Sequence, residues 1–73
     1  MPILNINTAK EYVLNYFDQF IHWGQSTPVI KRMNEVDYHG ERMIEVHFTF
    51  EDHINRDHVF AVWIEGDKLY GEW

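Results

Sequence analysis

Apolar side chains return every three or four residues between positions 9 and 21, as they do on one face of an amphipathic helix. Thr8 and Glu11 have the S/T-x-x-E spacing of a capping box, in which each side chain accepts a hydrogen bond from the backbone N–H of the other residue. Gly24 follows as a C-terminal stop. The pattern predicts a helix over residues 8–23.

Strict alternation replaces helical spacing in the middle of the chain. In RMIEVHFTF, every second residue from Ile44 to Phe50 is apolar, which is the period-two pattern of a β-strand with one buried face. The less regular segment VIKRMNEVDY precedes it, and His39-Gly40 lies between the two. This arrangement favours a β-hairpin.

The register of this first hairpin has two solutions. A two-residue turn at His39-Gly40 would place Lys31, Met33 and Glu35 on the apolar face of the strand. A register one residue longer would place Ile30, Val36 and Tyr38 on that face. Because a slip of one residue moves every side chain to the other face, we expect a longer loop or a β-bulge.

A second hairpin is predicted at the end of the sequence. The strands HVFAVWIE and KLYGEW are joined by EGDK, where Gly66 takes the first position of a type II′ turn. With Glu65 opposite Lys68, the remaining cross-strand pairs are Ile64–Leu69, Trp63–Tyr70, Val62–Gly71 and Phe60–Trp73.

The polar stretch EDHINRDH, residues 51–58, lies between the two hairpins. We expect it to be a connection between a strand that ends at Phe50 and one that starts near His58. Ile54 is its one apolar residue, which suggests that the connection folds back onto something apolar.

These elements predict an α+β fold, with one N-terminal amphipathic helix packed on a four-stranded antiparallel meander sheet. Residues 1–73 are expected to form a single domain, because so short a chain cannot support two cores. The chain has no cysteine, so neither disulfides nor thiolate metal sites can supplement the core.

One helix can cover only one face of this sheet, yet the final hairpin has large apolar side chains on both. We therefore predict a binding or dimer surface on the second face. Its residues are Trp63, Tyr70, Glu72, Met43 and His47. The alternative is that Trp63 and Tyr70 stack as a cross-strand pair beneath the N-terminal segment.

The charge balance narrows the choice of partner. Twelve acidic against six basic residues give a formal net charge of −6, which disfavours nucleic acid as a direct partner. No apolar run reaches the roughly 18–20 residues of a membrane span, and no basic segment followed by an apolar one opens the chain. We expect a cytoplasmic protein whose partner is a second copy or another protein.

Metal or catalytic chemistry has little support in these residue types. The five histidines include no H-x-H, H-x-x-x-H or H-E-x-x-H spacing, although a composite metal site is geometrically possible. Its residues would be His47, His53, His58 and Asp52. Ser26 is the only serine and lacks nucleophile-elbow glycines, so we expect neither catalytic residues nor a cofactor.

Three segments resemble parts of nuclear-transport-factor-2-like domains of the SnoaL-like kind, a cystatin-like α+β group. AKEYVLNYFDQF is similar to the helix, VDYHGERMIEVHFTF to a middle hairpin, and HVFAVWIEGDKLYGEW to the closing hairpin of that family. The resemblance covers residues 9–73 and implies a curved sheet packed on one helix, frequently in a homodimer. The family's further N-terminal helices have no counterpart in this sequence, so the resemblance does not imply an enclosed pocket or an inherited activity.

These observations predict a small acidic, non-catalytic interaction module. It would bind itself, a partner protein or a small apolar ligand through the aromatic sheet face. One alternative is an acidic inhibitor that mimics phosphate charge in the basic groove of a nucleic-acid enzyme. The other is a reduced pocket enzyme of the nuclear-transport-factor-2-like kind, completed by a second chain.

Overall fold

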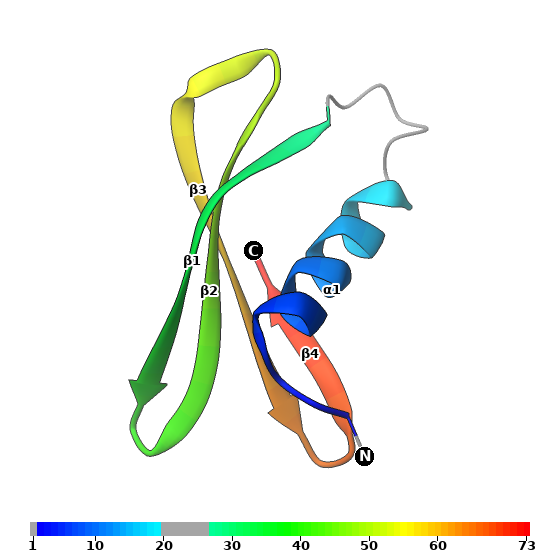
Figure 1. The fold of residues 1–73 in the computed structure, drawn as a ribbon, viewed down its shortest axis with the longest axis vertical. Coiled ribbons are helices and arrows are strands. Elements are labelled where there is room, and N and C mark those ends of the chain that lie inside the picture. The colour runs from blue at the N-terminus through cyan, green and yellow to red at the C-terminus, as the bar shows by residue number, and fades with distance from the viewer. Residues whose placement is uncertain (1, 20–26) are drawn as a thin grey trace.

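A computed structural model describes residues 2–19 and 27–73 of the chain (Figure 1). The elements follow in the order α1 (Ile6–Asp18), β1 (Pro28–Tyr38), β2 (Glu41–Phe50), β3 (His53–Glu65) and β4 (Lys68–Glu72). The strands form one antiparallel sheet in the order β1-β2-β3-β4, and α1 packs on it. The predicted α+β fold is confirmed. Within the described residues, no helix is long and apolar enough to cross a membrane.

The helix begins earlier than predicted, because Asn5 and not Thr8 is the N-cap. The Asn5 side-chain oxygen accepts a hydrogen bond from the Thr8 backbone N–H at 2.9 Å, and the Thr8 hydroxyl accepts one from the Asn5 N–H at 3.0 Å. Thr8 therefore plays the part that was predicted for Glu11. The helix starts at Ile6, since asparagine is at least as good an N-cap as threonine.

The C-terminal end of the helix is described as far as Gln19. Its last residue is Asp18, and Gln19 is the C-cap, whose backbone N–H donates to the Asn15 carbonyl at 3.4 Å. The predicted final turn, residues 20–23, and the stop at Gly24 lie outside the described residues.

We expect Asn5→Ala to lower the free energy of unfolding by about 1 kcal/mol, because the Thr8 N–H loses its partner at the helix start. Urea unfolding followed by circular dichroism measures the change. Asn7→Ala is the matched control, since Asn7 is an exposed helical residue and the hydrogen bonds of the capping box join only Asn5 and Thr8. An equal loss in both variants would show that the cap is not the cause.

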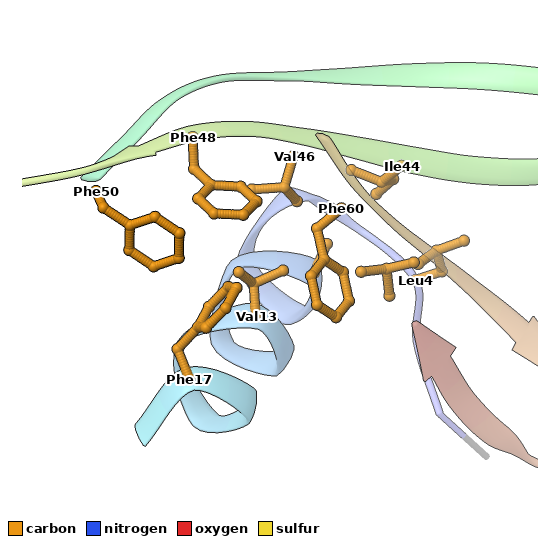
Figure 2. Packing of buried hydrophobic residues seen from close by; sticks show 10 residues of the cluster. Leu4, Val13, Phe17, Ile44, Val46, Phe48, Phe50 and Phe60 are labelled. Atoms are coloured by element: carbon orange, nitrogen blue, oxygen red, sulfur yellow. The ribbon is translucent and has the colours of Figure 1, made fainter. Parts of the chain in front are cut away.

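The hydrophobic core lies between α1 and one face of the sheet (Figure 2). Val13 and Phe17 point from the helix toward side chains of β2 and β3. The apolar residues at helical spacing in α1 and the alternating apolar residues of β2 and β3 thus form one cluster, as the sequence pattern predicted. Its buried members are Leu4, Ala9, Val13, Phe17, Ile44, Val46, Phe48, Phe50, Phe60 and Val62.

The first hairpin combines a two-residue turn with a β-bulge. Tyr38 pairs with Glu41, and His39 and Gly40 both have positive φ, at 54° and 83°, as a type I′ turn requires. The register then shifts between Ile30 and Arg32, which pair with Phe48 and His47. The expected bulge is confirmed and the longer loop is wrong.

The bulge has a physical cause in the spacing of apolar residues. Ile30 and Met33 are three positions apart, yet both pack against the core. Regular alternation would send one of them to the other face, so one extra residue, Lys31, is inserted between them. Glu35, and not Val36, consequently lies on the face of Ile44.

The stretch EDHINRDH was predicted to be a connection between strands, but this prediction is wrong because most of the stretch belongs to β3. Only Glu51 and Asp52 form the turn, Phe50 pairs with His53, and β3 starts there. Opposite the single residue Thr49 of β2, β3 has the four residues 54–57, so this part of the strand bulges away from the sheet. Ile54 is 65% exposed and does not fold back onto an apolar surface of the described chain.

The last hairpin has the predicted register. The pairs Glu65–Lys68, Ile64–Leu69, Trp63–Tyr70 and Val62–Gly71 are all present, and Gly66 has the positive φ of 65° that its turn position needs. The pair Phe60–Trp73 is not part of the ladder, because β4 ends at Glu72. The Trp73 ring lies instead 5.3 Å from the Phe17 ring.

Candidate functional site

The sheet face opposite α1, which we call the open face, is the candidate site. Ile44, Val46, Phe48, Phe60 and Val62 point toward the helix, so the residues that alternate with them along β2 and β3 point to the other side. Within residues 2–19 and 27–73, no helix or strand packs on that side (Figure 1).

An apolar row crosses all four strands of the open face. Cross-strand pairing brings Val36 opposite Met43, Met43 opposite Trp63, and Trp63 opposite Tyr70. Tyr70 is 41% exposed, and the other three side chains are half-buried by their neighbours. Directly opposed residues are neighbours on one face of a sheet, so these four side chains form an apolar strip.

Polar rows lie beside the apolar row. The next row toward the other end of the sheet is Asn34, Glu45, Ala61 and Glu72. The row after it is Arg32, His47 and Val59. On the opposite side of the apolar row, Glu65 pairs with Lys68. The apolar strip is therefore bordered by groups of both charges.

His47 lies between two polar neighbours on the open face. Its Nε2 atom is 3.4 Å from the Asn34 side-chain nitrogen and 3.5 Å from a Glu45 carboxylate oxygen. Only 18% of the His47 side chain is exposed. Protonation of the imidazole would convert the Glu45 contact into an ion pair.

A hollow of about 270 Å³ lies at the end of the open face, lined by Lys31, Arg32, His47 and Asp57. The Lys31 ammonium is 3.4 Å from a carboxylate oxygen of Asp57, although their strands lie on either side of β2. Thr49 of β2 lies next to this crossing and is only 2% exposed. The ion pair therefore bridges the sheet at this point.

The structure places all five residues of the predicted binding surface on the open face. Trp63 and Tyr70 face each other, Met43 continues their row, and His47 and Glu72 belong to the polar rows. Their role in binding stays a prediction.

The N-terminal segment does not cover this surface. Leu4 is buried in the core cluster on the helix side of the sheet. The cross-strand pair Trp63–Tyr70 is present, but the alternative in which it lies beneath the N-terminal segment is wrong.

The structure separates the histidines proposed as metal ligands. His47 is on the open face, whereas His58 pairs with Phe48 on the helix side and stacks on its ring at 5.4 Å. His53 pairs with Phe50, and Asp52 lies in the preceding turn. Among the described residues, no three histidine or carboxylate side chains are placed to hold one metal ion.

The hollow was not predicted from the sequence. Lys31 and Arg32 are adjacent in sequence, and regular alternation would direct them to opposite faces. The bulge brings both to the hollow, and the irregularity of β3 brings Asp57 to it. The uneven spacing of Ile30 and Met33 was the one signal in the sequence. It indicated the bulge, but not which residues the bulge would contact.

Comparisons with protein families, with curated proteins and with solved structures found no match to this chain.

Proposed function

We propose that this protein is a non-catalytic interaction module that associates with a second copy of itself through the open face. The apolar row Val36–Met43–Trp63–Tyr70 is the observation that carries the proposal. An apolar strip with a polar border is the usual anatomy of a protein interface, and tyrosine, tryptophan and methionine are enriched in such strips.

Two properties favour a second copy as the occupant. The chain as a whole has a net charge of −6, but the open face carries Glu45 and Glu72 together with Arg32 and Lys68. When two copies of such a face meet, each charged side chain can lie opposite a side chain of the other sign on the second copy. A chain of 73 residues also buries a smaller fraction of its surface on folding than a larger domain does, and self-association adds buried apolar area.

We expect Tyr70→Glu to weaken self-association by at least about tenfold, because it puts a charge into the apolar row directly opposite Trp63. Sedimentation velocity from low to high micromolar concentration measures the change. Leu14→Glu is the matched control, since Leu14 is 39% exposed, much like Tyr70 at 41%, but lies on α1. Wild-type protein that stays monomeric at high micromolar concentration, or equal weakening by both substitutions, would contradict the proposal.

The other expectations from sequence have less support. An acidic inhibitor rests on the net charge of −6 alone, whereas the open face carries both signs of charge. A relationship to nuclear-transport-factor-2-like domains rests on the order of one helix and an antiparallel meander, and a pocket of that kind would need a second chain. A cytoplasmic location is compatible with the absence of cysteine.

A further inference from the structure

Two irregularities of the sheet lie at the same level, on either side of β2. In β1 the extra residue is Lys31, which lies between the partners of Phe48 and His47. In β3 the extra residues are 54–57, which lie between the partners of Phe48 and Phe50. Bulges re-aim side chains and are frequent beside functional sites. Here they bring Lys31 and Asp57 together across β2, at 3.4 Å, and shape the hollow of about 270 Å³.

The lining of this hollow has one positive charge in excess. Lys31 is paired with Asp57, but Arg32 forms no ion pair with another described residue. His47, directly opposite Arg32 in the register, adds an imidazole. Glu45 is not part of the lining, but one of its carboxylate oxygens contacts His47.

We propose that this hollow binds a carboxylate, with the Arg32 guanidinium as its main partner and Lys31 and His47 beside it. A guanidinium presents two parallel N–H donors that match the two oxygens of a carboxylate. The volume of the hollow lies just below the roughly 300–1,000 Å³ of drug-sized ligand sites and is ample for a carboxylate group. The carboxylate comes from a free small acid or from an acidic side chain of a peptide.

This site shares Arg32 with the polar border of the open face, but Arg32 lies two rows away from Val36 and is not part of the apolar row that carries the self-association proposal. A protein that never dimerises would still have it. Loss of carboxylate binding would likewise leave the self-association proposal intact.

Titration of isotope-labelled protein with sodium acetate, at ionic strength held constant with sodium chloride, tests the site by nuclear magnetic resonance. We expect saturable shifts of the Arg32 side-chain N–H and the His47 ring signals. Arg32→Gln should weaken acetate binding by about tenfold or more, because a hydrogen-bonded charge is lost. Arg42→Gln is the matched control, since Arg42 is paired with Glu35 and lies far from the hollow.

Further arms identify the source and class of the ligand. A capped glutamate peptide that binds much more tightly than acetate would assign the site to an acidic peptide, and equal binding would assign it to a free acid. Inorganic phosphate that binds far more tightly than acetate would overturn the carboxylate assignment. Shifts that never saturate, or that Arg42→Gln removes as fully as Arg32→Gln, would overturn the site itself.

Discussion

We expect Phe17→Ala to remove a large share of the protein's free energy of unfolding. Phe17 is almost fully buried, and its ring lies 5.1–5.9 Å from the rings of four residues of the sheet and C-terminus, namely Phe48, Phe50, Phe60 and Trp73. Replacing a buried phenylalanine by alanine costs about 3–5 kcal/mol. At about 0.05–0.15 kcal/mol per residue, a chain of 73 residues has roughly 4–11 kcal/mol of stability in total.

Thermal unfolding measures the effect, and a fall in Tm of at least about 12 °C follows from that cost. Leu14→Ala is the control on the same helix, because Leu14 is partly exposed and alanine favours a helix. Phe17→Leu retains most of the volume and should lose much less stability. If Phe17→Ala and Leu14→Ala cost the same, the aromatic cluster is not the centre of the core.

Gly71→Ala should also destabilise the protein clearly, although it adds only a methyl group. A Cβ at this position would lie 2.4 Å from the Cε1 atom of Phe60 and 2.5 Å from that of Tyr12. The Tyr12 ring is only half-buried, but the Phe60 ring is fully buried, so a shift of Phe60 would disturb the core. Overpacking of this kind costs about 1–3 kcal/mol.

Urea unfolding of a double-mutant cycle isolates this clash. Leucine at position 60 lacks the ring atoms that the new methyl group would meet, so Gly71→Ala should cost less in a Phe60→Leu background than in the wild type. Glu72→Ala is the control on the same strand, because Glu72 is exposed. A Gly71→Ala variant as stable as the wild type would show that β4 can move away from α1.

The helix start shows how far local rules reach. A capping box was expected at Thr8, and a capping box is present, but it pairs Asn5 with Thr8. Asn5 and Thr8 are both good N-cap residues and both precede the same apolar helix face, so the apolar pattern alone did not distinguish between these two starts. The hydrogen-bond geometry of Asn5 decided the start.

The stretch EDHINRDH shows where apolar patterns carry no information. Residues 53–57 are exposed in the structure, and a polar sequence is compatible with either a loop or an exposed strand. Their assignment to β3 depends on the backbone partner, which lies far away in the sequence. The hollow depends in turn on this segment, because Asp57 comes from it.

The sequence by itself determined the element types, the core face of the helix, the alternating faces of β2 and β3, and the register of the last hairpin. Each of these follows from spacing within a short segment or from the turn residues between two strands, as with Gly66. Only the tertiary structure decided the bulge position, the start of β3 and the meeting of Lys31 with Asp57 across β2. These features depend on how three strands align, and the energy of that alignment is summed over distant pairs that no local pattern contains.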